Sequence, residues 1–173
     1  ITYVENAAAT AINTAITVND VDNTTLASAT VSITGGLATS EDLLTFTNVP
    51  ATMGNISGSY NAATGVMSLS SSGNTATLAQ WEAALRSIQY SNSSENPSTT
   101  ARTISYTVND SALNSNTVTS TINITTVNDA PTLSVTSSNP TFTEGAGSSQ
   151  GAGRTRAARQ DRGDLPRRST RAS

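Results

Sequence analysis

The tripeptide Val-Asn-Asp occurs three times in this chain, and each copy ends a run of Thr, Ile and Val that alternates as a β-strand does. The copies begin at Val18, Val108 and Val127, and the last continues into Ala130-Pro131. Alternating β-branched residues suit a half-buried pleated surface, whose period is two residues. An acidic residue at each strand end would gather oxygen ligands at the ends of an all-β module. The pattern therefore indicates a site for a hard cation and not an enzyme.

The composition excludes several kinds of site. The chain has 173 residues, of which 35% are hydrophobic and 12% charged, and it contains no Cys, His or Lys. This hydrophobic share is enough for one domain with a thin core between two sheets. The absence of Cys and His excludes disulfide frameworks, Cys/His zinc sites, and Ser-His-Asp or Cys-His catalytic sites. No stretch of about 18 apolar residues occurs, so we expect no membrane insertion.

Charge is divided unevenly along the chain. Residues 1–150 contain ten acidic and two basic residues, a net charge of −8, whereas residues 151–173 contain seven Arg and two Asp, a net charge of +5. A strongly acidic module is expected to attract cations and to avoid nucleic acid.

Seven segments have the period and composition of β-strands. Short polar turns separate them, including hairpin loops at 61–65 and 110–116, and strands at such intervals are typical of a Greek-key sandwich. We therefore predict an all-β fold, a Greek-key (cadherin- or Ig-like) β-sandwich of about seven strands with one short helix. The predicted strands are 12–18, 27–33, 43–46, 56–60, 66–69, 102–108 and 117–126.

One segment, 77–87, has helical spacing instead. Thr77 and Gln80 form the sequence pattern of a capping box at its start. We expect this helix to pack the only Trp over one edge of the sandwich as part of the core, and not as a cofactor site. Its apolar positions are Leu78, Trp81, Leu85 and Ile88.

A boundary is expected where Asn128-Asp129 runs into Ala130-Pro131, because Pro cannot donate to a sheet and restricts the residue before it. The pattern Phe142-x-Glu144 then repeats Tyr3-x-Glu5 from the start of the chain. Residues 1–130 are thus predicted to form one repeat, and residues 131–144 a linker and the start of a following repeat. Because the chain begins at Ile1 without Met or a signal peptide, we expect it to be an internal piece of a longer protein.

Residues 145–173 have no strand period and few large apolar residues, so we expect this Arg-rich tail to be disordered. Seven Arg without Lys favour a frameshifted or vector-derived sequence over a genuine basic tail.

The acidic residues at strand ends are the candidate ligands. Asp20 and Asp22 can point to the same end of the module while Val21 turns inward, and Asp110 ends a different strand. Their mutual repulsion would be unfavourable without a cation. The alternative interpretation is a solvated Asx-turn.

Over residues 1 to about 144 the chain resembles the cadherin-like repeats found in tandem in very large bacterial surface and secreted adhesins. The resemblance rests on Glu5-Asn6-Ala7, Asp20-Val21-Asp22, Val108-Asn109-Asp110 and Val127-Asn128-Asp129-Ala130-Pro131. In that family Ca²⁺ lies at each junction between repeats. The resemblance implies an upper half-site of Asp20, Asp22 and Asp110 and a lower half-site of Glu5, Glu95, Asn128 and Asp129, which the next repeat completes.

The chain also departs from the family pattern. Around Glu95 it reads Ser93-Ser94-Glu95-Asn96 where the family has Asp-Arg-Glu, and its linker has one acid or amide fewer than the fullest pattern. Fewer ligands imply weaker binding or fewer ions at each junction.

The expected function is that of a calcium-binding structural spacer repeat in an extracellular or cell-surface adhesin. Its partners would be neighbouring repeats of the same chain, with a cell-surface protein or glycan contacted through other domains. The alternative is a carbohydrate- or protein-binding β-sandwich module of a secreted protein, which would need exposed aromatic residues. A glycoside hydrolase would need a cleft between paired carboxylates, for which the predicted sandwich has little room.

Overall fold

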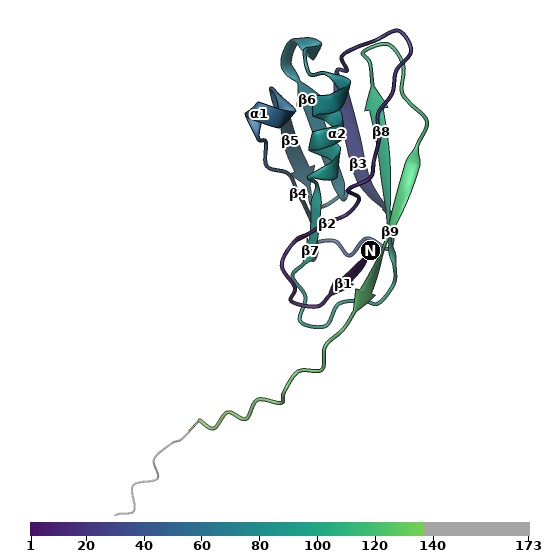
Figure 1. Ribbon diagram of the computed structural model, residues 1–173. Helices are drawn as coiled ribbons and strands as arrows, with labels where there is room; N and C mark the ends of the chain where they lie inside the picture. The colour runs from purple at the N-terminus through teal and green to yellow at the C-terminus, as the bar shows by residue number, and fades with distance from the viewer. Residues whose placement is uncertain (137–173) are drawn as a thin grey trace, which may run out of the picture. The chain divides into compact units, whose positions relative to one another are not determined.

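Alternating aliphatic and hydroxyl residues build the larger of two sheets, which has the strand order β1-β9-β8-β3-β6-β5 (Figure 1). In β3 the aliphatic residues face the core and the Ser and Thr residues face outward, as the period of two requires. All neighbouring strands are antiparallel except β1, which runs parallel to β9. The strands are β1 (Thr2–Val4), β3 (Ser28–Gly35), β5 (Ile56–Asn61), β6 (Val66–Ser71), β8 (Arg102–Asn109) and β9 (Val118–Thr125).

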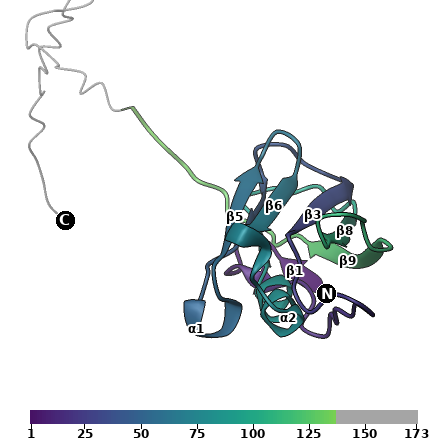
Figure 2. The ribbon, with the colours of Figure 1, turned by 90° about the horizontal axis from the view of Figure 1, so that it is seen from above.

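The second layer combines a three-stranded antiparallel sheet with a helix. The sheet has the order β2-β7-β4, with β2 at Thr10–Ala11, β7 at Gln89–Asn92 and β4 at Asp42–Thr45. The helix α2 (Leu78–Arg86) leads into β7, and Figure 2 shows it on one side of the larger sheet. Single turns occur at α1 (Pro50–Met53) and at the 3₁₀ segment Ser72–Asn74. The predicted all-β sandwich is therefore confirmed.

The computed structural model describes residues 1–136, of which Ile1–Ala130 form one compact unit. Residues 131–136 have neither helix nor strand. The expected start of a following repeat lies partly, and the Arg-rich segment 145–173 wholly, outside the described residues. Within the described part of the chain, no helix is long and apolar enough to cross a membrane.

The helix α2 begins at the predicted capping box. The Thr77 hydroxyl oxygen accepts from the Gln80 N–H at 3.3 Å, and the Gln80 carbonyl Oε1 accepts from the Thr77 N–H at 2.9 Å. Trp81 is fully buried, and its Nε1–H donates to the Leu26 carbonyl oxygen at 3.1 Å. The indole is thus both packed and hydrogen-bonded, as a buried Trp requires.

Residues 12–18 do not form the predicted strand, since β2 already ends at Ala11. The Asn13 side chain accepts from the Ala15 N–H at 2.9 Å and donates to the Ser120 hydroxyl at 3.0 Å. Such local bonds offer the backbone an alternative to a sheet ladder. Ile16 is nevertheless buried, so the apolar pattern predicted burial correctly but the wrong backbone conformation.

A fully buried ion pair joins the two layers. The Nε atom of Arg102 in β8 lies 2.9 Å from Oδ2 of Asp42 in β4, and both side chains are inaccessible to solvent. Arg102 also donates to the carbonyl oxygens of Ser98 and Thr100. The backbone N–H of Ala38 donates to Asp42 Oδ2 at 2.7 Å. The pair is therefore embedded in further hydrogen bonds, without which a buried ion pair is unfavourable.

Strand β7 completes this buried network. The Tyr90 hydroxyl donates to Asp42 Oδ1 at 2.5 Å, and the Asn92 amide donates to the same oxygen at 2.8 Å. Burial and the hydrogen bond to Asp42 raise the pKa of Tyr90 well above its ordinary value of 10.0, so the phenol stays a donor. Tyr90 also packs edge-on against Tyr3, with ring centroids 5.1 Å apart. Asp42 consequently links both sheets.

We predict that Asp42→Ala lowers the free energy of unfolding by about 3–5 kcal/mol, because it leaves the Arg102 charge buried without its partner. Urea denaturation followed by the fluorescence of the single Trp measures this change. Glu41→Ala is the matched control: it removes the neighbouring carboxylate, which is in no ion pair within residues 1–136, and should cost less than about 0.5 kcal/mol. Equal effects of the two substitutions would contradict the role assigned to the pair.

Candidate cation site

Six of the nine acidic residues in 1–136 form two groups, which lie at opposite ends of β9. Asp110 lies in the loop before this strand and Asp129 in the segment after it, and the strand itself spans eight residues, about 26 Å. We call Asp20, Asp22 and Asp110 the upper group, and Glu5, Glu95 and Asp129 the lower group. Figure 1 shows the two ends, with the β8–β9 loop at one and the end of β9 at the other.

The lower group brings three carboxylates together. One oxygen from each of Glu5, Glu95 and Asp129 lies within 4.8 Å of the other two. Oxygens bound to one Ca²⁺ at about 2.3–2.6 Å can lie up to roughly 5 Å apart, so this spacing suits a shared ion. The three residues come from the end of β1, the loop after β7 and the segment after β9.

Glu5 is the buried member of the lower group. It is only 4% exposed, and its Oε2 accepts from the Val127 N–H at 2.7 Å. Its backbone N–H donates to the Thr125 carbonyl oxygen at 2.9 Å, which fixes the residue against the end of β9. Its other oxygen, Oε1, is buried and has no hydrogen-bond partner. A buried carboxylate oxygen without a partner is unfavourable, so we expect a further ligand at Glu5 Oε1.

Asn6 positions the second carboxylate of the lower group. Its amide donates to Glu95 Oε2 at 2.9 Å, and its backbone has a φ of 60°, a left-handed conformation that Asn tolerates better than most residues. Asn128, also predicted as a ligand, is the neighbour of the clustered Asp129, and its amide donates to the Asp129 carbonyl oxygen at 3.2 Å. Sequence reasoning assigned no role to Asn6, although it is part of the Glu-Asn-Ala motif.

The upper group lines a shallow hollow at the other end of the sandwich, together with Leu113 and Asn114 among others. The Asn23 amide lies between two of its carboxylates, 3.4 Å from Asp110 Oδ2 and 3.5 Å from Asp22 Oδ1. The three predicted residues are thus gathered at one end. Their carboxylate oxygens do not all lie within 4.8 Å of one another, as those of the lower group do.

Backbone N–H groups already donate hydrogen bonds to a carboxylate oxygen of the upper group. Asp20 Oδ1 accepts from the N–H groups of Asp22 at 3.1 Å and Asn23 at 2.8 Å, which is the Asx-turn considered as the alternative. Val21 does not turn inward as expected but is 99% exposed, because this turn directs its side chain to solvent. The position of the Asp20 carboxylate therefore has a local explanation, unlike that of Glu5.

Backbone N–H groups lower the pKa of two of the upper carboxylates, Asp20 and Asp110. The N–H groups of Leu113 and Ala112 lower the pKa of Asp110 below its ordinary value of 3.8, and the nearby Asp20 charge opposes this. The N–H groups of Asn23 and Asp22 lower the pKa of Asp20. The carboxylates of Asp20 and Asp110 are therefore ionised at neutral pH.

No basic side chain neutralises either group. Residues 1–136 contain nine acidic residues and two basic ones, Arg86 and Arg102. Arg86 pairs with Glu82 at 3.0 Å and Arg102 pairs with Asp42, so seven acidic residues are left without a basic partner in this part of the chain. Among the described residues no basic side chain is therefore left to neutralise the lower group, and a cation from solution can do so.

Neither a family model, nor a curated protein, nor a solved structure matches this chain.

Titration of the carboxyl carbons by NMR in chelator should give a pKa below 3.8 for Asp110. Because folding depresses this pKa, the ionised group stabilises the fold above pH 3.8 and loses that contribution as the pH falls through the folded-state value. The denaturation midpoint of the wild type should therefore fall more steeply below pH 4 than that of Asp110→Asn. In Asp20→Asn the pKa of Asp110 should drop further, since the opposing charge is gone. A value of 3.8 or higher in the wild type would show that repulsion by Asp20 outweighs the turn.

Proposed function

We propose that this chain is a calcium-binding structural repeat of a large extracellular adhesin, in which Ca²⁺ at the lower group stiffens the junction to the next repeat. The observation that carries the proposal is the buried, unpartnered Oε1 of Glu5 beside two further carboxylates. Water could hydrate one such oxygen, but three carboxylates within 4.8 Å of one another also require charge compensation.

The chemistry of the lower group favours Ca²⁺ over other metals. All three groups offer hard carboxylate oxygens, and the described residues contain no His or Cys that would select zinc or copper. Ca²⁺ takes six to eight oxygens in flexible geometry, so three carboxylates supply part of the set. Water and the upper group of a neighbouring repeat can supply the rest, which fits the resemblance to tandem cadherin-like repeats.

Binding at this position couples the end of the sandwich to the segment that leaves it. Glu5 is held at the end of β1, Glu95 follows β7, and Asp129 lies beyond β9. An ion shared by the three would restrain residues 126–130 against the module. Extracellular calcium modules bind at about 10⁻⁴–10⁻³ M, so a few to ten millimolar Ca²⁺ stabilises by roughly 1–3 kcal/mol.

The alternative, a carbohydrate- or protein-binding module, has less support. Trp81, Tyr3, Tyr90 and Tyr106 are at most 3% exposed. Phe46 and Tyr60 are partly buried against the core, and Phe142 lies outside the described residues. Within residues 1–136 no pair of exposed aromatic side chains offers a stacking platform.

We predict that 5–10 mM Ca²⁺ raises the melting temperature of the wild-type chain by several degrees relative to chelator, as stabilisation of roughly 1–3 kcal/mol requires. Mg²⁺ at the same concentration should act less, because it prefers six ligands at about 2.0–2.1 Å and retains its water. Glu5→Gln should remove most of the Ca²⁺-dependent rise, since it removes the charge while keeping the side chain's size. Differential scanning calorimetry measures all three effects.

Glu82→Gln is the control for this experiment, because Glu82 is an acidic residue paired with Arg86 and outside both groups. Its loss can lower the melting temperature in chelator, but the rise caused by Ca²⁺ should be unchanged. No rise in the wild type, together with no heat of binding in titration calorimetry, would refute calcium binding and leave the sandwich intact.

A further inference from the structure

One buried hydroxyl group bonds the two segments that carry Glu5 and Glu95. The Tyr3 hydroxyl donates to the Ala7 carbonyl oxygen at 2.8 Å and lies 3.3 Å from the Asn92 carbonyl oxygen, a three-centre arrangement. Ala7 follows Glu5 by two residues. Asn92 precedes Glu95 by three residues. A single side chain therefore bonds the backbone close to two ligands that are 90 positions apart in the sequence.

The first of these segments is a turn that presents the buried carboxylate. The Ala7 N–H donates to the Val4 carbonyl oxygen at 3.0 Å and closes a four-residue turn. Glu5 and Asn6 occupy the two central positions of this turn. Because the Tyr3 hydroxyl bonds the last residue of the turn, it fixes both the buried ligand and the amide that holds the second ligand.

The second segment starts at Asn92, the last residue of β7. The Asn92 amide donates to the buried Asp42 carboxylate at 2.8 Å, and its side-chain oxygen accepts from the Ser94 N–H at 2.8 Å. Arg102, the partner of Asp42, donates to the Ser98 carbonyl oxygen at 3.1 Å and holds the far side of the same loop. The loop that carries the second ligand is therefore anchored in the core.

Tyr3 itself is held from several sides. It is 1% exposed, and its ring packs edge-on against Tyr90 with the ring centroids 5.1 Å apart. Its backbone lies opposite Ile124 in β9, the strand that leads to Asp129, the third carboxylate of the lower group. All three segments that carry ligands are thus tied to this one residue.

We propose that Tyr3 is a positioning residue of the cation site, whose hydroxyl keeps Glu5 and Glu95 at the separation that Ca²⁺ requires. Three carboxylates within 4.8 Å of one another repel, so their backbones must be held together before the ion arrives. A site that is ordered in advance loses less entropy on binding, and groups that orient metal ligands contribute about 10–100-fold to metal affinity. The inference rests on the proposed function, because it concerns the same Ca²⁺ site.

Tyr3→Phe tests this role, because it removes the hydroxyl and keeps the ring that packs against Tyr90. Titration calorimetry with Ca²⁺ should give an affinity about tenfold weaker than that of the wild type. The free energy of unfolding in chelator is measured alongside by urea denaturation. A residue that only stabilised the fold would lower this energy and leave the Ca²⁺ affinity of the folded chain unchanged.

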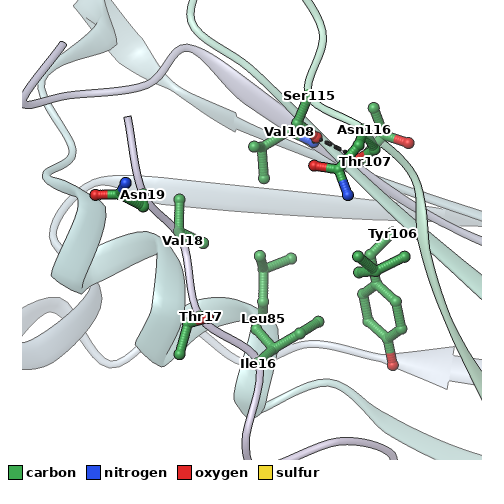
Figure 3. A pocket seen from close by; sticks show the side chains of 11 residues that line it. Ile16, Thr17, Val18, Asn19, Leu85, Tyr106, Thr107, Val108, Ser115 and Asn116 are labelled. Atoms are coloured by element: carbon green, nitrogen blue, oxygen red, sulfur yellow. Dashed lines mark hydrogen bonds between the residues drawn. The ribbon is translucent and has the colours of Figure 1, made fainter. Parts of the chain in front are cut away.

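Tyr106→Phe is the matched control. Tyr106 is 3% exposed, and its hydroxyl has no hydrogen-bond partner among the described residues. It lies beside a small hollow between the 16–19 segment and the β8–β9 hairpin (Figure 3), and none of the residues that line this hollow belongs to the lower group. The Ca²⁺ affinity of Tyr106→Phe should equal that of the wild type.

A double-mutant cycle with Glu95→Gln tests whether Tyr3 acts through the carboxylates. Once the charge at position 95 is removed, adding Tyr3→Phe should weaken binding by less than about twofold, and NMR chemical-shift titration follows these weaker affinities. Equal affinities of the wild type and Tyr3→Phe, or the same loss in both backgrounds, would overturn the role of Tyr3 and leave the cation site in place. No heat of Ca²⁺ binding with the wild type would refute the cation site and this inference with it.

Discussion

The ion pair between Asp42 and Arg102 constrains both the fold and the charge of this module. It joins the two layers of a sandwich whose core is thin, and it removes from the surface one of only two basic side chains in residues 1–136. The other, Arg86, is occupied by Glu82 on the same helix. The remaining acidic residues therefore have no basic partner within residues 1–136, and their distribution decides where a cation can act.

That distribution is not uniform. Six of the seven acidic residues without a basic partner fall into the upper and lower groups, separated by the length of β9. The outward faces of the long strands carry mainly Ser, Thr and Asn, so the sides of the sandwich are almost uncharged. Two like-charged ends repel each other when modules are placed end to end, and a divalent cation between them reverses that repulsion. A string of such modules would thus be flexible without the cation and stiff with it.

The two acidic groups are not equivalent. In the upper group, Asp20 and Asp110 accept from the N–H groups of their own turns, which explains the positions of these two carboxylates without any ligand. Glu5 in the lower group is held by Val127 through Oε2, and its buried Oε1 has no hydrogen-bond partner. One of its carboxylate oxygens lies within 4.8 Å of oxygens of Glu95 and Asp129. A buried carboxylate oxygen without a hydrogen-bond partner is the stronger sign of a binding site, and for this reason the proposal is centred on Glu5.

Local patterns in the sequence predicted much of the fold. The capping box at Thr77, the hairpin between β5 and β6 with Gly65 at positive φ, and the period-two strands β3 and β8 all follow from interactions between residues close in sequence. The 12–18 segment was predicted wrongly because Asn13 binds its own backbone, a competition that hydrophobic periodicity does not report. Strand β7 has four residues and was missed, since so short a run has no readable period.

Contacts between distant residues were harder to foresee. Asp42 and Arg102 are 60 positions apart, and nothing in the composition distinguishes them from surface charges. The gathering of Glu5 and Glu95 was expected only through the resemblance to cadherin-like repeats, because 90 residues separate them in the chain.

The position of the bound ion tests this account most directly. In a crystal structure of the chain grown with millimolar Ca²⁺, an ion should lie about 2.3–2.6 Å from Glu5 Oε1, with oxygens of Glu95 and Asp129 in the same coordination shell. An ordered water hydrogen-bonded to Glu5 Oε1, with Ca²⁺ absent or bound only near Asp20 and Asp110, would contradict it.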